Sequence, residues 1–157
     1  MLYQTNRAFP KEVQKYGCYF MSLLRMVELV SLKEFTVDQI NALYTHSVWK
    51  GYIIGKCSCN KPDNIVKEAF SMLLSKNIAY QVGSKSYGAD PKTVWWPWVM
   101  KNDKFKQVDY LLGQFATTGE FGTHYCLLDR NEVVIYDPYD KPYTRLDLLG
   151  SHIYRVL

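Results

Sequence analysis

A cysteine, a histidine and an aspartate stand at positions where they could together carry out nucleophilic chemistry. Cys18 follows Tyr16 and Gly17 and opens a strongly apolar stretch with helical periodicity. At the first residues of a helix, the exposed N–H groups and the helix dipole favour a thiolate, which is a competent nucleophile. A free cysteine is more often a small buried residue of the core, so position alone leaves both roles open for Cys18.

His124 and Asp137 are predicted to face each other across a β-hairpin. If the turn centres on Arg130 and Asn131, His124 of the first strand is opposed to Asp137 of the second. Opposed side chains have Cβ atoms about 4.5–5.5 Å apart, so Asp137 can accept a hydrogen bond from the imidazole and fix its orientation. A bulge in the hairpin would shift this register and remove the pairing. Taken singly, His124 suits a half-buried strand, and Asp137 suits the turn before Pro138.

The order of these residues resembles that of the papain-like cysteine peptidases. The matching stretches are QKYGCYFMSLLRM (residues 14–26) and GTHYCLLDRNEVVIYDP (residues 122–138). They look most like the small bacterial branch that includes peptidases cutting double-glycine leaders. In that branch a Gln precedes the Cys that opens a helix, and a His on a strand is followed by a hairpin ending in Asp-Pro. The order covers most of the chain, and it also resembles an uncharacterised family of small bacterial and phage proteins, which implies no function.

The resemblance implies a papain-like fold with Cys18 as nucleophile, His124 as general base and then acid, and Asp137 as the orienting group. It also implies that the Cys18 N–H and the Gln14 side chain bind the oxyanion. Gln14 precedes Cys18 by four residues, closer than is usual in the family, and Tyr19 follows where relatives commonly have Gly. We therefore expect cleavage of an amide bond in a peptide or protein substrate through a Cys18 thioester resolved by water, without a cofactor. Deamidation or transfer to another amine would use the same residues.

A second interpretation is that the chain has the same fold but no catalytic activity. An inactive descendant of the fold would bind or inhibit a cellular protein through surface aromatic side chains. Trp95, Trp96 and Trp98, which surround Pro97, are candidates for such a patch, although aromatic residues serve packing more often. Labelling of Cys18 by an electrophile distinguishes this interpretation from the hydrolase.

A third interpretation uses the other cysteines as metal ligands. Cys57, Cys59, His124 and Cys126 supply three thiolates and an imidazole, a legitimate ligand set for structural zinc. The C-x-C and H-x-C spacings differ from the usual pairs, which counts against zinc. Cys57 and Cys59 are also too close for easy mutual bridging, so we expect reduced thiols rather than a disulfide framework.

Helical patterns fill the first half of the chain. The apolar stretch from Gly17 onward predicts a central helix that is covered on more than one side. Thr36 and Gln39 have capping-box spacing and predict a second helix ending near His46. A third helix is predicted to start at residues 60–63, with Pro62 near its first position, and to stop at Asn77.

Strand patterns fill the second half. The period changes to two at residues 79–82, and further strands are predicted at residues 108–116, 123–128, 133–137 and 152–157. Residues 83–106 carry too many turn residues to assign. Helices followed by an antiparallel sheet predict an α+β fold, and no linker divides the chain, so residues 1–157 are expected to form one domain.

Composition narrows the classes of partner. The net charge is +4, with basic residues scattered along the chain, which gives no argument for nucleic acid. The apolar stretch at residues 18–30 is interrupted by Arg25 and Glu28 and is shorter than the roughly 20 residues of a membrane span. The N-terminal residues lack a signal-peptide pattern, so a cytoplasmic location is the expectation. The oligomeric state is not specified.

Overall fold

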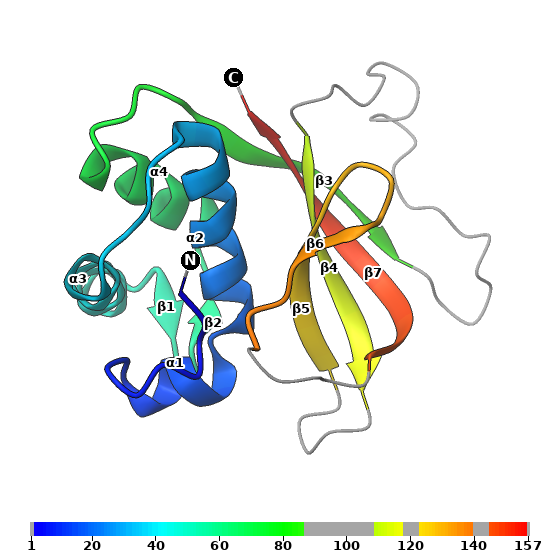
Figure 1. Cartoon of the computed structure of the whole chain (residues 1–157), viewed down its shortest axis with the longest axis horizontal. Coiled ribbons are helices and arrows are strands. Elements are labelled where there is room, and N and C mark those ends of the chain that lie inside the picture. The colour runs from blue at the N-terminus through cyan, green and yellow to red at the C-terminus, as the bar shows by residue number, and fades with distance from the viewer. Residues whose placement is uncertain (1, 87–108, 118–122, 140–144, 157) are drawn as a thin grey trace.

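The computed structural model describes residues 2–86, 109–117, 123–139 and 145–156 of the chain. The segment with Trp95, Trp96 and Trp98 lies outside the described residues, as does most of the unassigned stretch 83–106. The predicted α+β class is confirmed: helices lie on one side and an antiparallel sheet on the other (Figure 1).

The helices and strands that the sequence predicted follow one another in the predicted order. The helices are α1 (Lys11–Tyr16), α2 (Cys18–Ser31), α3 (Val37–Trp49) and α4 (Pro62–Met72). The short strands β1 (Ile53–Ile54) and β2 (Ser58–Cys59) form a small ribbon between α3 and α4. The remaining strands are β3 (Ala79–Ser86), β4 (Tyr110–Thr117), β5 (Thr123–Leu128), β6 (Val134–Tyr136) and β7 (Arg145–Val156). The sequence patterns did not predict α1, β1 or β2.

Helix α2 is the central helix that its composition predicts. It stands between the other helices and the sheet (Figure 1), and its buried side chains include Phe20, Leu23 and Val27. Its one buried acid, Glu28, accepts hydrogen bonds from the Phe35 backbone N–H at 2.9 Å and from the Arg25 guanidinium at 3.1 Å. A helix apolar on most sides is stable here because both neighbouring layers cover it.

The predicted helix signals are partly confirmed. Both hydrogen bonds of the capping box between Thr36 and Gln39 are present, and α3 runs on to Trp49, beyond the predicted end near His46. Helix α4 begins at Pro62 as predicted. Its end was placed too late: Met72 is its last residue, and the left-handed residue that follows is Leu74 (φ 53°) rather than Asn77.

The large sheet has the strand order β3-β7-β4-β5-β6, with every neighbouring pair antiparallel. Strand β7 is longer than the predicted strand because it begins at Arg145. The predicted hairpin register is wrong. Leu128 pairs with Val134 but Leu127 pairs with Tyr136, so the ladder between β5 and β6 contains a bulge.

The two faces of the sheet bury different clusters. Leu112, Leu127 and Tyr154 belong to the core shared with the helices, whereas Leu111, Cys126 and Leu128 belong to a smaller cluster. This alternation along β4 and β5 is the period of two expected for strands.

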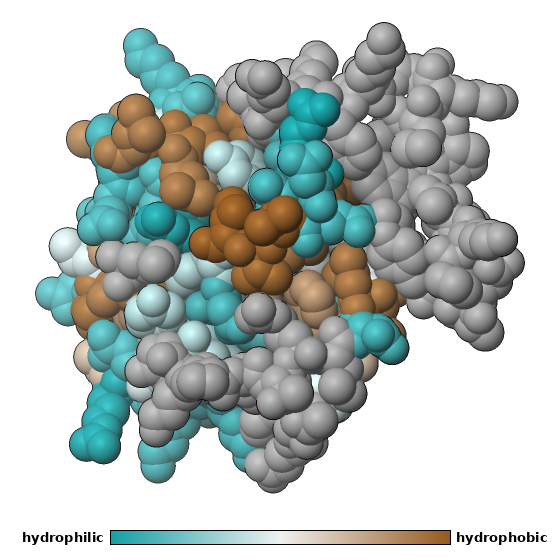
Figure 2. Space-filling view, turned by 45° about the vertical axis from the view of Figure 1, so that its right-hand side comes forward, coloured by the Kyte–Doolittle hydropathy of each residue, from teal (hydrophilic) through white to brown (hydrophobic). Residues whose placement is uncertain are grey.

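Figure 2 shows one face of the molecule, where hydrophobic side chains gather near the centre between hydrophilic ones. None of the described helices is both long enough and apolar enough to cross a bilayer.

Candidate active site

The junction between α1 and α2 places Cys18 at the first position of the central helix. The Gly17 N–H donates to the Val13 carbonyl at 2.9 Å, and the Met21 N–H donates to the Gly17 carbonyl at 2.8 Å. A Cβ on Gly17 would lie 2.4 Å from the Val13 carbonyl oxygen, closer than real contacts allow. The missing side chain therefore lets the two helices meet without a loop, so that the N-terminus of α2 presents Cys18.

The His124 and Asp137 side chains meet as predicted, although the register on which the prediction rested is wrong. Nε2 of His124 lies 2.7 Å from Oδ1 of Asp137. Asp137 follows the last residue of β6, Tyr136, so its position is set by the chain beyond the ladder rather than by cross-strand pairing. The same carboxylate oxygen accepts a hydrogen bond from the Tyr139 N–H at 3.0 Å. The pair is well shielded, since 2% of the His124 side chain and 18% of the Asp137 side chain are exposed.

The N-terminal segment holds the chain on both sides of Asp137, which the sequence patterns did not predict. The Tyr136 hydroxyl donates to the Leu2 carbonyl at 2.7 Å. The Gln4 N–H donates to the Pro138 carbonyl at 3.0 Å. One bond holds the Tyr136 side chain and the other holds the Pro138 backbone, so residues more than 130 places away in the sequence help to position the Asp137 carboxylate.

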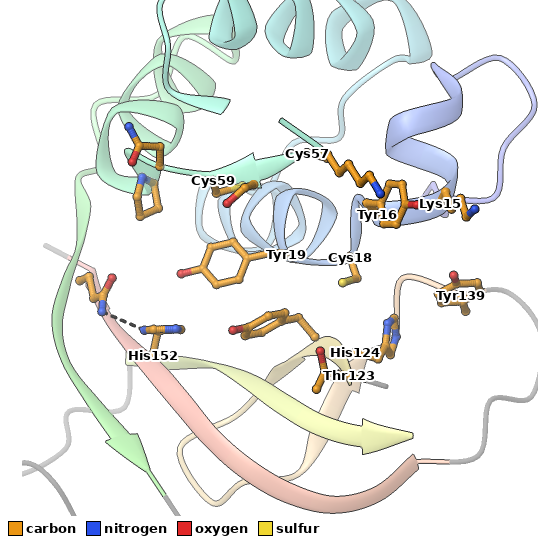
Figure 3. Close-up of a pocket in the computed structure, with 16 residues that line it drawn as sticks. Lys15, Tyr16, Cys18, Tyr19, Cys57, Cys59, Thr123, His124, Tyr139 and His152 are labelled. Atoms are coloured by element: carbon orange, nitrogen blue, oxygen red, sulfur yellow. Dashed lines mark hydrogen bonds between the residues drawn. The ribbon is translucent and has the colours of Figure 1, made fainter. Parts of the chain in front are cut away.

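The His124 ring lines the same pocket as the Cys18 thiol, so the three residues of the predicted triad lie in and beside one pocket. Figure 3 shows Cys18 at the end of α2 and His124 on the opposite wall of the same pocket. Burial alone lowers the pKa of His124, but the Asp137 carboxylate and the nearby thiols of Cys126 and Cys18 outweigh it and raise the pKa to about 11. The imidazolium form of His124 is therefore favoured at neutral pH. The Tyr139 ring stands edge-on to the imidazole, with the centroids 4.9 Å apart.

The pocket between α2 and the sheet has a volume of about 560 Å³, within the range of small-molecule and peptide sites. On one side of Cys18 its wall is aromatic and consists of Tyr19, Tyr125 and His152. Tyr19 packs edge-on against both other rings, and its hydroxyl lies 2.7 Å from that of Tyr154. Burial lowers the pKa of His152, so this ring is neutral, and its Nδ1 lies 3.0 Å from Nε2 of Gln81.

Two further thiols line the pocket but differ from Cys18 in their surroundings. Burial raises the pKa of Cys57 to about 12 and raises that of Cys59 well above its ordinary value. Both therefore remain protonated and poorly nucleophilic near neutral pH. They provide internal references for the reactivity of Cys18.

The structure does not bring Gln14 to the pocket. Its side-chain amide donates to the Phe9 carbonyl at 2.6 Å, and Gln14 is not among the residues that line the pocket. The Gln14 carbonyl in turn accepts a hydrogen bond from the Gln4 side chain at 3.1 Å. The geometry thus gives Gln14 a place in the packing of α1 and does not support an oxyanion contact.

The possible metal ligands are grouped differently from the predicted zinc set. Within the described parts of the chain, ligand atoms of His124, Cys126 and Asp137 all lie within 4.8 Å of one another. Cys57 and Cys59 do not join this group. The zinc set with those two cysteines is therefore wrong, and the group that forms overlaps the candidate triad.

Comparison with known families places the chain in one of them. The model of the family described as "Protein of unknown function, DUF261" matches residues 1–148. The chain belongs to the DUF261 family. No curated protein and no solved structure matches it. The description of the DUF261 family names no activity.

Proposed function

We propose that this DUF261 protein is a cysteine-dependent hydrolase of papain-like architecture that cleaves an amide bond in a peptide or protein. The observation that carries the proposal is a single pocket that is lined by both Cys18 and His124, together with the 2.7 Å hydrogen bond between the His124 ring and the Asp137 carboxylate. A nucleophile, a base and a group that orients the base are the parts that acyl transfer through a thioester requires.

In the proposed reaction, the Cys18 thiolate attacks the amide carbon and forms a C–S bond. The negative oxygen that results is stabilised by the Cys18 N–H at the start of α2, where backbone donors are exposed. His124 gives its proton to the leaving nitrogen as the C–N bond breaks. Neutral His124 then takes a proton from water, which attacks the thioester and releases the carboxylic acid and the thiolate. Asp137 remains ionised throughout and stabilises the imidazolium.

The order of the elements supports the papain-like part of the proposal. The nucleophile begins the central helix, the base lies on a strand of the antiparallel sheet, and the pocket lies between them. The pocket leaves the nucleophile accessible, since Cys18 is half-buried while its partner His124 is almost fully buried.

The first experiment measures labelling of each cysteine by iodoacetamide at pH 7, with peptide mapping by mass spectrometry. We expect Cys18 to react at least tenfold faster than Cys57 and Cys59, whose thiols stay protonated. His124→Ala should slow the labelling of Cys18 by roughly 100-fold, because a positioned base or imidazolium contributes about that much. Labelling of Cys18 at the rate of the other two cysteines would contradict the proposal and favour the binding module.

The second experiment tests the reaction itself. The protein is incubated with a mixed peptide pool, and new termini are identified by mass spectrometry in H₂¹⁸O. Cleavage should incorporate one ¹⁸O into each new carboxyl group and should be absent in Cys18→Ala. Cleavage that persists in Cys18→Ala would assign the activity to another group and refute the role of Cys18.

A further inference from the structure

His152 is a pocket residue that the proposed chemistry does not use. It lies on β7 and lines the pocket together with Tyr19 and Gln81. Figure 3 shows Tyr19 and His152 on one side of Cys18 and His124 on the other. A substrate that spans Cys18 therefore meets His152 in the direction away from the candidate base.

The pairing of β3 with β7 brings Gln81 to His152. Gln81 is opposite Tyr154 in the ladder, and His152 lies two residues before Tyr154, so the three side chains share one face of the sheet. The Gln81 N–H donates to the Asp63 carboxylate at 3.0 Å, which ties β3 to the first turn of α4. The Gln81 side chain is thereby held beside the imidazole.

The hydrogen bond between these two side chains fixes the tautomer of His152. Nε2 of Gln81 lies 3.0 Å from Nδ1 of His152. An amide nitrogen donates and does not accept, so Nδ1 is the acceptor in this bond. Burial lowers the pKa of His152, so the ring carries a single proton at neutral pH, and that proton is on Nε2. His152 therefore presents an N–H donor of fixed position.

The Nε2–H donor of His152 is available to a ligand. Among the described residues, the ring forms no hydrogen bond other than the one with Gln81. Its other contacts are ring packing: Tyr19 stands edge-on with the centroids 5.6 Å apart, and Tyr125 lies at 28° with the centroids 6.2 Å apart. A partly buried donor without an acceptor is costly, so this part of the pocket favours a ligand that brings an acceptor oxygen.

The side chains around this donor are uncharged. Burial raises the pKa values of Tyr19, Tyr125 and Cys59, so all three keep their protons at neutral pH. A charged ligand group would lose its hydration here, and these side chains offer it no opposite charge. A carboxamide fits better, because it is planar and uncharged and offers an acceptor oxygen to His152 and an NH₂ group to a tyrosine hydroxyl.

We propose that His152 is a specificity-determining residue that binds the side-chain oxygen of a Gln or Asn residue of the substrate, and that Gln81 positions it. This inference rests on the proposed function and adds a substrate class to it: peptides with a carboxamide side chain close to the amide bond that Cys18 attacks. The rings of Tyr19 and Tyr125 form the apolar surface against which the rest of that side chain packs.

The first test determines the tautomer and needs no ligand. Long-range ¹H–¹⁵N spectra near neutral pH should show His152 with Nε2 protonated and Nδ1 unprotonated, its signals being assigned by their loss in His152→Phe. In Gln81→Glu the new carboxylate accepts instead of donating, so Nδ1 should become protonated. Gln114→Glu is the matched control, because Gln114 is also half-buried in the sheet but does not line the pocket. A proton on Nδ1 in the wild type, or an unprotonated Nδ1 in Gln81→Glu, would overturn the inference.

The second test measures binding to Cys18→Ala, which requires no catalysis. Four fluorescein-labelled heptapeptide pools, all C-terminal amides, carry Gln, Glu, Leu or Lys at the centre and the same mixture of other residues elsewhere. We expect the Gln pool to bind about fivefold more tightly than the Leu pool, since this is the usual contribution of one hydrogen bond. It should also bind more tightly than the Glu and Lys pools, whose charged groups must be desolvated.

Two substitutions decide whether His152 causes the preference. His152→Phe keeps a ring but removes the donor, so the Gln and Leu pools should bind equally to Cys18→Ala/His152→Phe. His46→Phe is the control, because His46 also packs beside an aromatic ring, that of Trp49, but does not line the pocket. The preference should persist in Cys18→Ala/His46→Phe. A preference that survives His152→Phe, tighter binding of the Glu, Leu or Lys pool, equal binding of the pools or no binding would overturn the inference.

The inference and the proposed function fail separately in these experiments. If iodoacetamide labels Cys18 no faster than Cys59 while the Gln pool still binds through His152, the hydrolase is refuted and the carboxamide site remains as a binding site. If Cys18 is labelled rapidly but the four pools bind equally, the inference alone is refuted.

Discussion

Replacing Asp137 with Asn tests whether the carboxylate orients and charges His124 or merely fills space. The substitution keeps the shape of the side chain and an oxygen that can accept from both Nε2 of His124 and the Tyr139 N–H. It removes the negative charge and replaces the second carboxylate oxygen with an amide NH₂ group. Any change in the chemistry of Cys18 can therefore be assigned to electrostatics rather than to a collapsed site.

The expected magnitude follows from the geometry of the pair. The contact is short, at 2.7 Å, and water is largely excluded, since only 2% of the His124 side chain is exposed. A hydrogen bond between charged groups in such surroundings contributes about 1.5–3 kcal/mol. One pKa unit corresponds to about 1.4 kcal/mol, so Asp137→Asn should lower the pKa of His124 by about 1–2 units. Because the lowered pKa still lies above 7, His124 remains an imidazolium at pH 7, and the loss of the charge should appear in the His124 titration rather than in the rate of Cys18 labelling at pH 7.

Two measurements check this expectation. The chain contains three histidines, so NMR titration of the imidazole protons can resolve the His124 signal, which is assigned by its loss in His124→Ala. Iodoacetamide labelling as a function of pH reports on the nucleophile. The control is Asp129→Asn in the same hairpin, where the carboxylate accepts from the N–H groups of Asn131 and Val133 and has no contact with His124. A His124 pKa in Asp137→Asn that stays within about 0.3 units of the wild-type value would refute the reasoning.

Three other predictions concern stability. Gly17→Ala places a methyl group 2.4 Å from the Val13 carbonyl oxygen, so α1 must move. The free energy of unfolding, measured in urea, should fall by about 1–3 kcal/mol. A fall of less than about 0.5 kcal/mol would contradict the close approach. Asp109→Asn removes the carboxylate charge that forms two 3.2 Å hydrogen bonds with buried Arg155. The free energy of unfolding should fall by about 3–5 kcal/mol. An unchanged urea midpoint would show that the ion pair contributes little to stability. The pKa of His124 is raised to about 11 in the folded protein, so this residue stabilises the fold fully at pH values below its pKa in the unfolded chain and loses that contribution as pH rises towards 11. The difference in the free energy of unfolding between wild type and His124→Ala should therefore narrow from about pH 6.5 to about pH 10. A difference that grows over this range would contradict the prediction.

The parts of the fold that sequence patterns predicted are those with local causes. Helix α2 follows from an apolar stretch, the start of α3 from the capping box of Thr36 and Gln39, and β5 from its composition. Helix α1 and the β1–β2 ribbon are too short to produce a periodic signal, and they became visible only in the structure. The hairpin register failed because the Asp129 carboxylate binds two N–H groups of the turn, and Glu132 takes a positive φ of 65°.

The candidate site was likewise predicted only in part. Cys18, His124 and Asp137 were identified by type and order; the structure pairs His124 with Asp137 and places Cys18 and His124 in the lining of one pocket. Gln14 was placed by analogy with a motif, but its amide has a nearer acceptor in the Phe9 carbonyl.

The sequence by itself determined which residue types could do chemistry, that a helix begins at Cys18 and that His124 lies on a strand, because helix starts and strand periods depend on neighbours a few positions away. Tertiary structure decided that these groups meet. Bringing Cys18 to His124, and Leu2 to Tyr136, requires closing loops of more than a hundred residues, an entropy cost that only burial of the shared core between α2 and β5 offsets. Long-range contacts of this kind are set by the packing of the whole core, which no segment of the chain encodes alone.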